Sequence, residues 1–422
     1  MKFSVAYGTY EGLLRTLHAF NAEDALDSPQ ADETREQMDA AWRELSQSER
    51  LLLRGLSADL YSLTNEEIVR GDAFLNETLL LQAAQREYDA GDWFSLLETL
   101  RALSDKLPRA MVAYMRGRCW REIGRSEPAL WFFELAHQLD PAQPNYELLV
   151  LDTMFQSSRK PEAIAKARAL LKSPQARPYV VIGAAKVVSE MASQLPEEQA
   201  AEFYADIINS LPDSLDRLAK ERTLDLVSSL LLAGHLCLAI AYERLGEMGQ
   251  SRRTYDQVIA SFPGQDEIVV ARAMFLFVVD EVNAWRDLKE LVARRTSNVY
   301  PYFFLAHRAL KEEHYERCME LCDLVLRNTT HSLLRAHALE WTAISIYEKG
   351  ASIESAKELL REAVYLEPLN ENIRKNLEVA EKLEKQARSP LSDFVLSQPI
   401  RPSDVTRNIQ RRLTFEPPRQ RA

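Results

Sequence analysis

The chain has 422 residues, of which 46% are hydrophobic and 27% are charged, as in an ordinary folded protein. Its net charge is −11, and because a body this acidic repels a phosphate backbone, nucleic acid is not expected as a partner of the folded part. The four cysteines indicate no disulfide framework, and no stretch predicts a secretory signal or a membrane span. We therefore expect a cytoplasmic protein.

The first 75 residues show no repeat spacing and are expected to form a helical lead-in segment. An apolar rhythm predicts a helix over residues 10–20. The acidic stretch that follows is expected to begin with a solvated loop over residues 22–33. Two capping-box pairs, Ser46 with Glu49 and Thr64 with Glu67, then predict the starts of two helices.

From residue 76 the spacing of prolines predicts helical hairpins with a period near 34. Pro108, Pro141 and Pro174 are 33 residues apart. Each is expected to end a second helix, because proline lacks an N–H and restricts the residue before it. Pro212 is expected to do the same in a looser unit, with an extended helix over 214–229 after it. A charged helix over residues 370–386 is expected to cap the array.

The unit from 110 to 141 shows the repeat most clearly. Small and large residues stand there at the positions where two helices touch: Gly117, Trp120, Ala129, Phe133, Ala136 and Pro141. This spacing resembles the tetratricopeptide repeat family, over about residues 76–386. The resemblance implies an all-α, right-handed superhelix of about eight antiparallel helical hairpins, since one hairpin cannot bury its apolar face alone. The lead-in segment resembles those that precede the repeats of some bacterial tetratricopeptide proteins.

The resemblance also implies a function in protein binding. In this family the leading helix of each unit lines a concave groove, and partners are peptides or helices that lie along it. By position, Tyr114 and Arg118 would face the groove in one unit, and Tyr300, Phe303 and His307 in a later one. Aromatic and arginine side chains suit binding hot spots, although ordinary contacts between repeats would explain them equally well. The lysine and asparagine with which some members clamp a terminal carboxylate are missing at these positions.

No catalytic, metal or cofactor site is expected, so we predict a non-catalytic scaffold or adaptor. His314, Cys318 and Cys322 share the four-residue spacing of a helical metal site. The two cysteines, however, occupy helix-packing positions, and a free cysteine packs as a small hydrophobe. The sequence shows no phosphate-binding glycine loop, metalloprotease histidine pair or nucleophile elbow.

The last segment, residues 387–422, differs in composition. It holds five prolines, seven arginines and three acidic residues, and it is expected to be flexible. The alternative to protein binding is that this tail binds nucleic acid or another anionic surface through Arg401, Arg407, Arg411 and Arg412. The tail could also fold back on acidic surface and compete with a ligand for the groove. The identity of the partner and the oligomeric state do not follow from the sequence.

Overall fold

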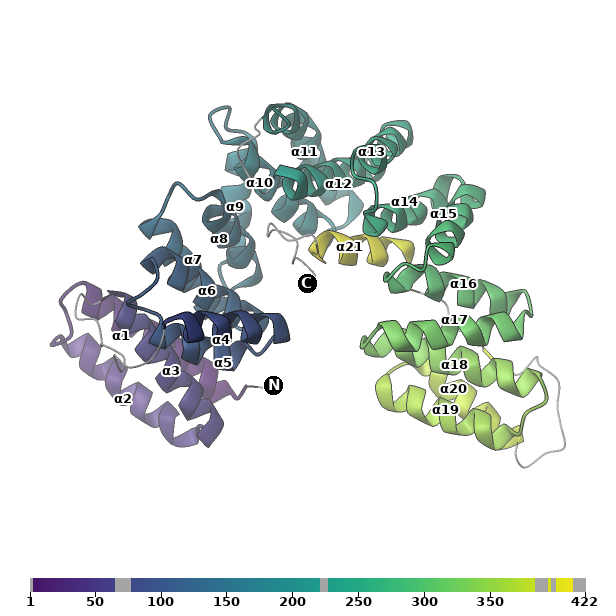
Figure 1. Ribbon diagram of the computed structural model, residues 1–422, viewed down its shortest axis with the longest axis horizontal. Helices are drawn as coiled ribbons and strands as arrows, with labels where there is room; N and C mark the ends of the chain where they lie inside the picture. The colour runs from purple at the N-terminus through teal and green to yellow at the C-terminus, as the bar shows by residue number, and fades with distance from the viewer. Residues whose placement is uncertain (1–2, 65–76, 221–226, 384–393, 396–399, 413–422) are drawn as a thin grey trace. The chain divides into compact units, whose positions relative to one another are not determined.

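The computed structural model is all-α and describes residues 3–64, 77–220, 227–383, 394–395 and 400–412 (Figure 1). The chain forms two compact units, residues 1–166 and residues 167–422. We describe each unit by itself. The division at 166 lies inside the predicted repeat array, whereas the predicted boundaries stand at 75 and 386.

Unit 1 begins with three helices and continues with helical hairpins. The helices are α1 (Val5–Ala22), α2 (Pro29–Glu44), α3 (Gln47–Thr64), α4 (Glu77–Ala90), α5 (Trp93–Ala102), α6 (Arg109–Glu122), α7 (Ser126–Leu139) and α8 (Pro144–Gln156). Helix α9 (Lys160–Leu171) crosses the division between the units. The predicted loop over 22–33 is wrong beyond Ser28. The side chain of Ser28 accepts a hydrogen bond from the backbone N–H of Ala31, and Pro29 occupies the first turn, so α2 begins there.

The predicted capping box at the start of α3 is present, and its glutamate also contacts a second helix. The Glu49 carboxylate accepts hydrogen bonds from the backbone N–H of Ser46 at 2.9 Å and from that of Ser4 at 2.8 Å. Glu49 therefore joins the beginnings of α1 and α3. Of the second predicted pair, Glu67 lies outside the described residues.

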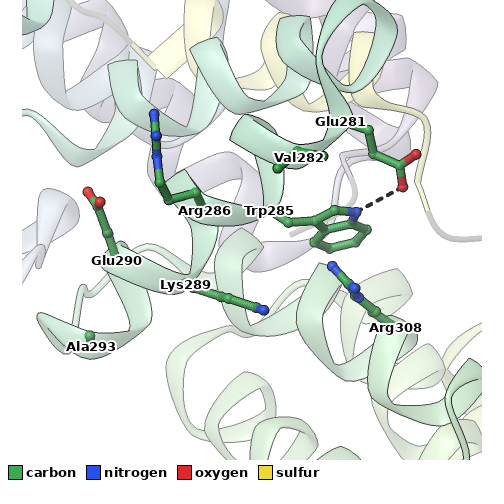
Figure 2. A pocket seen from close by; sticks show the side chains of 8 residues that line it. All are labelled: Glu281, Val282, Trp285, Arg286, Lys289, Glu290, Ala293 and Arg308. Carbon is green, nitrogen blue, oxygen red and sulfur yellow. Dashed lines mark hydrogen bonds between the residues drawn. The ribbon is translucent and has the colours of Figure 1, made fainter.

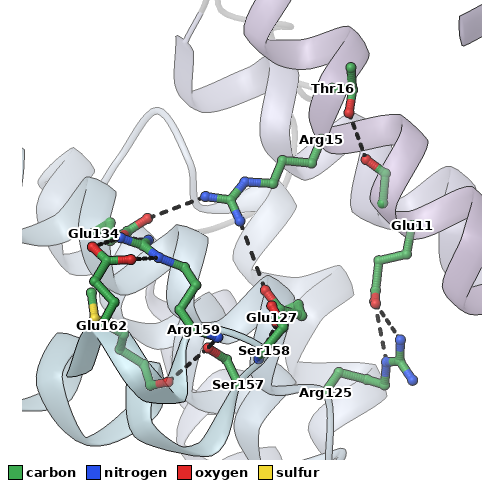
Figure 3. A network of polar contacts seen from close by, with 12 residues as sticks. Glu11, Arg15, Thr16, Arg125, Glu127, Glu134, Ser157, Ser158, Arg159 and Glu162 are labelled. Atoms are coloured by element: carbon green, nitrogen blue, oxygen red, sulfur yellow. Dashed lines mark hydrogen bonds and ion pairs between the residues drawn. The ribbon is translucent and has the colours of Figure 1, made fainter. Parts of the chain in front are cut away.

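The lead-in helices are integral to unit 1. Asp59 of α3 is fully buried, and its carboxylate accepts two hydrogen bonds from the guanidinium of Arg101 in α5, at 2.7 and 3.1 Å. Arg116 of α6, also fully buried, donates to the Asp59 carbonyl at 3.0 Å. Helix α1 contacts the repeats as well, through an ion pair between Glu11 and Arg125 and the network around Arg15 (Figure 3). The fully buried charges of Asp59 and Arg116 lie 3.3 Å apart and so are paired, as burial requires.

The α6–α7 hairpin shows why small residues recur in the sequence. The turn between the helices is made at Gly124, whose φ of +86° is a conformation that glycine adopts without strain. An ideal Cβ on Gly117 would lie 2.7 Å from the ring of Phe133, so only glycine allows this approach. Ala129 and Ala136 are fully buried at the same interface. The predicted packing of this unit is confirmed.

Unit 2 continues the array. Its helices are α10 (Pro178–Ala192), α11 (Glu197–Leu218), α12 (Val227–Arg244), α13 (Met248–Ser261), α14 (Asp266–Val279), α15 (Glu281–Ala293), α16 (Val299–Lys311), α17 (Tyr315–Asn328), α18 (Ser332–Glu348), α19 (Ile353–Leu366), α20 (Glu371–Leu383) and α21 (Pro402–Arg412). Pro212 lies inside α11, so the prediction that it ends a helix is wrong. The predicted helix over 214–229 is not continuous, because α11 ends at Leu218 and α12 begins at Val227.

Among the described residues, consecutive repeat helices pack as hairpins in the pairs α4–α5 and α6–α7 of unit 1 and α10–α11, α12–α13, α14–α15, α16–α17 and α18–α19 of unit 2, and α1 packs on α2 in the lead-in segment. The capping helix predicted over 370–386 is present as α20. In unit 2 the leading helices of neighbouring hairpins touch, α10 with α12 and α16 with α18. We call the surface formed by the leading helices α10, α12 and α14 the inner face.

Candidate functional site

The inner face of unit 2 is occupied by a helix of the same chain. Helix α21, drawn in yellow in Figure 1, lies against α10, α12 and α14. It thus stands where the sequence analysis expects an external peptide or helix to bind. The interface shows what kind of ligand this surface accepts, so we treat it as the candidate site.

The buried face of α21 is one strip of four side chains, of which two are apolar. Val405 and Ile409 are 0% and 1% exposed, and the side chains next to them, Thr406 and Gln410, are also buried. Residues four apart share one face of a helix, so these four form a single strip along α21. Burying a valine or isoleucine side chain stabilises a complex by about 1.5–3 kcal/mol. The strip therefore supplies the main attraction to the inner face.

Polar contacts determine the position of α21 along the inner face. Arg407 donates a hydrogen bond at 3.0 Å to the carbonyl of Ser193, which is the C-cap residue of α10. A cation is favoured there by the negative end of the helix dipole. Arg411 donates from Nε to Oε1 of Glu190, in the last turn of α10, at 2.9 Å. Two arginines one helical turn apart thus hold the carboxyl end of α10.

A thiol lies underneath the helix. The amide of Gln410 approaches the Sγ of Cys237, in α12, at 3.7 Å, and this cysteine is buried. Burial is the main cause that raises the pKa of the Cys237 thiol to about 12. At neutral pH the group is therefore a neutral thiol, which is neither a nucleophile nor a good metal ligand.

The predicted binding residues near α16 have different surroundings. Tyr300 contacts α21, because its hydroxyl accepts a hydrogen bond from the Asn408 side chain at 3.3 Å. Phe303 is fully buried, with its ring centroid 4.7 Å from that of Trp341 in α18. His307 is 6% exposed and lies 5.1 Å from the same ring. The prediction that Phe303 and His307 face a ligand is corrected, since they pack between the leading helices α16 and α18.

The predicted binding residues of unit 1 also pack between helices. The ring of Tyr114 lies 5.4 Å from that of Tyr146 in α8 and 6.3 Å from that of Phe133. The guanidinium of Arg118 lies 5.0 Å from the Tyr88 ring centroid, and Arg118 is 7% exposed. Both side chains therefore contribute to the contacts between neighbouring hairpins.

The prediction of a flexible tail is wrong for residues 402–412, which form α21. Of the four nominated arginines, Arg407 and Arg411 bond to the carboxyl end of α10, and Arg401 is exposed just before α21 and pairs with Asp404 of that helix. The side chain of Arg412 lies outside the described residues. The overlooked signal was a local one: a proline at the first position, an acid in the first turn, and the apolar strip at four-residue spacing.

A second candidate lies at the surface between α15 and α16 (Figure 2). It is a depression of about 710 Å³ around Trp285, whose Nε1 donates to Glu281 at 2.9 Å. The guanidinium of Arg308 lies 4.7 Å from the Trp285 ring centroid. The lining carries charges of both signs and selects no ligand class.

Cys318 and Cys322 are fully buried on one face of α17, with their sulfur atoms 3.9 Å apart, so the predicted packing role is confirmed. His314 is exposed at the start of that helix and pairs with Glu312. Within the described ranges, no group of three or more His, Cys, Asp or Glu residues could hold a metal ion. None of the helices in those ranges is long and apolar enough to cross a membrane.

The hairpins, their glycine turns and the small residues at their crossings give the chain an all-α helical-repeat fold, as its tetratricopeptide-like spacing predicts. No protein-family model matches the chain, and no curated protein does. Among solved structures, the chain is similar to a tetratricopeptide repeat protein from Parabacteroides merdae, with 16% identity, a TM-score of 0.38, and coverage of 72% of this chain and 98% of that one. It is also similar to the C-terminal part of a TPR repeat-containing protein from Cytophaga hutchinsonii, with 14% identity, a TM-score of 0.30, and coverage of 69% and 97%. A third, the Cut9–Hcn1 heterotetramer of the APC/C, has 14% identity, a TM-score of 0.29, and coverage of 89% and 83%. These TM-scores are low, so the fold type depends on the hairpins of this chain itself.

Proposed function

We propose that this protein is a non-catalytic interaction scaffold that binds a helix of a partner protein on the inner face of unit 2. The observation that carries the proposal is α21, an amphipathic helix seated on α10, α12 and α14. Recognition of an amphipathic helix by a surface of packed helices is a common mode of peptide binding. The tail is then the first known ligand of that surface, held in cis.

The resident helix indicates the chemistry of the partner. A partner helix would present apolar side chains at the spacing of Val405 and Ile409, and arginines at the spacing of Arg407 and Arg411. The apolar pair supplies affinity, and the arginines align the helix with the carboxyl end of α10. The net charge of −11 also favours a basic ligand.

The rival function, binding of nucleic acid or an anionic surface by the tail arginines, gains no support from this arrangement. Arg407 and Arg411 already contact Ser193 and Glu190, so a phosphate would have to displace both contacts. Binding through phosphates would also weaken steeply with salt, which separates the two functions experimentally.

The test uses the full-length chain with its own tail helix weakened by V405D/I409D. A fluorescent peptide of residues 400–412 is added in trans, and its anisotropy is followed at two salt concentrations. We expect saturable binding to this variant and weaker binding to the wild type, whose inner face is filled. A peptide that itself carries V405D/I409D should not bind.

The control variant is V278D/V282D, which adds the same two carboxylates at valines that are 69% and 80% exposed in unit 2. It should behave as the wild type, because its resident helix is intact. Absence of peptide binding to the V405D/I409D chain would contradict the proposed function. Peptide binding that vanishes in high salt and is matched by an oligonucleotide would favour the rival.

We also propose a bacterial source, from the kind of lead-in segment that the chain resembles, and a cytoplasmic location. Fractionation of native cells, with an antibody against the protein, tests the location.

A further inference from the structure

A second piece of the tail is bound at the far end of unit 2, in a different manner. Phe394 and Val395 lie in the chain between the cap α20 and the helix α21. Phe394 packs on α18, α19 and α20, and Val395 bonds to Asn376 of α20. We propose that α18, α19 and α20 form a second peptide-binding site, which takes a short non-helical segment bearing an aromatic side chain. Its resident, Phe394–Val395, fastens α21 to the inner face. This inference deepens the proposed function and rests on α21 being the ligand held there.

The backbone of Val395 is captured by one side chain. The Asn376 amide nitrogen donates to the carbonyl of Val395 at 2.8 Å, and the amide oxygen accepts from the N–H of Val395 at 2.8 Å. A primary amide can satisfy both backbone groups of one residue in this way, as a neighbouring β-strand would. Asn376 contacts only backbone groups of Val395, so this contact requires no particular side chain at that position. Val395 is itself 43% exposed.

Buried side chains of α18 fix the orientation of the Asn376 amide. Asn376 is fully buried, and its amide nitrogen also donates to Oε1 of Glu340 in α18 at 2.7 Å. Glu340 is fully buried too, and its other oxygen lies 3.2 Å from Nδ1 of His337. A buried carboxylate that binds the amide nitrogen fixes which way the amide points. The orientation needed to capture a peptide backbone is therefore built into the core.

Phe394 supplies the side-chain contact. Its ring lies edge-on to that of Tyr347, with centroids 5.5 Å apart. It also packs on the buried cluster of Ala343, Ala356, Leu360 and Ala380, which joins α18, α19 and α20. The small alanines leave room for an aromatic ring at this place. An aromatic residue beside a captured backbone is thus the ligand class of the site.

The Phe394–Val395 segment and helix α21 act together because they belong to one chain. Val395 and Val405 are ten positions apart, so capture of the first keeps α21 at a high local concentration near the inner face. A short link of this kind raises apparent affinity without any new contact at the helix itself. An external helix must therefore compete with a ligand that is held at two points.

The experiment measures hydrogen exchange of residues 402–412 in the full-length chain by mass spectrometry. The substitutions are made on the ligand side, so that α18–α20 stay intact. F394A removes the ring, and V395P removes the N–H that donates to Asn376. We expect both variants to exchange about ten-fold faster than the wild type over 402–412, with exchange of residues 315–328 in α17 unchanged.

The matched control is V395A, which keeps the backbone N–H and carbonyl and trims the side chain of a residue that is 43% exposed. It should exchange as the wild type does. Unchanged exchange of 402–412 in both F394A and V395P, or equal effects of V395A and V395P, would overturn the inference. The result is independent of the peptide-binding test, because exchange reports the docking of the chain's own helix.

Discussion

The Nε of Arg411 donates to Oε1 of Glu190 at 2.9 Å, although the two residues are 221 positions apart in the chain. The Glu190 side chain is 11% exposed and that of Arg411 is 48% exposed, so the pair is partly screened by water. It lies beside the apolar strip of α21, whose burial supplies most of the binding. The ion pair therefore sets the register of the helix more than its affinity.

The first prediction concerns this pair. R411Q should raise hydrogen exchange over residues 402–412 by a factor of up to about five, because a partly exposed ion pair contributes about 0–1 kcal/mol. The difference from the wild type should shrink in high salt. The matched variant is R401Q, since Arg401, the residue just before α21, is 79% exposed and pairs with Asp404 in the first turn of that helix. Equal effects of the two substitutions would show that the contact with Glu190 is immaterial.

The second prediction concerns acid stability in unit 1. The N–H of Ser4 and the groups of Ser46 lower the pKa of Glu49 from 4.5 to about 2. A carboxyl group with a lowered pKa stabilises the fold above pH 4.5, and this contribution is lost as the pH falls towards 2. E49Q should lower the free energy of unfolding by about 2 kcal/mol at pH 7, as expected for hydrogen bonds to a charged group.

Denaturant unfolding at pH 7 and pH 2, read by hydrogen exchange in α1 and α3, measures this effect. The variant and the wild type should converge at the lower pH. E44Q, at the exposed last residue of α2, is the control and should change little at either pH. A deficit of E49Q that is the same at both pH values would contradict the assigned cause.

The third prediction concerns the crossing of α6 and α7. G117A places a methyl group 2.7 Å from the Phe133 ring and 3.2 Å from the carbonyl of Ala129. The overpacking should lower the free energy of unfolding by about 1–3 kcal/mol. G8A is the control, because a Cβ there meets nothing within 4 Å in α1, and alanine is the better helix former by about 1 kcal/mol. If G117A melts like the wild type, the helices can separate at this point.

The fourth prediction uses the thiols as reporters. All four cysteines are buried, so alkylation of the native protein should be slow. V405D/I409D should accelerate alkylation of Cys237, which lies under Gln410, while Cys318 and Cys322 in α17 keep their wild-type rates. Mass spectrometry after digestion resolves the sites. Faster alkylation at all four cysteines would indicate general unfolding rather than release of α21.

Much of the fold could be read from local patterns. The turn at Gly124, the packing of Gly117 and Phe133, and the capping box of Ser46 and Glu49 all depend on residues within a few helical turns of one another. The charged cap α20 followed from composition alone. Pro212 was misjudged because proline ends a helix only where nothing around it compensates for the lost hydrogen bond, and α11 continues through it.

By itself the sequence determined that this chain is an array of helical hairpins, because helix periodicity, glycine turns and small crossing residues act over short distances. Only the tertiary structure decided what occupies the binding surface. The contacts of α21 join residues 108, 173, 214 and 221 positions apart, and no local pattern couples them. The same holds for Phe303 and His307, which are buried because Trp341 of the neighbouring leading helix packs on them. Burial depends on which residues are neighbours in space. The composition of the tail predicted flexibility, although residues 402–412 form the ordered helix α21.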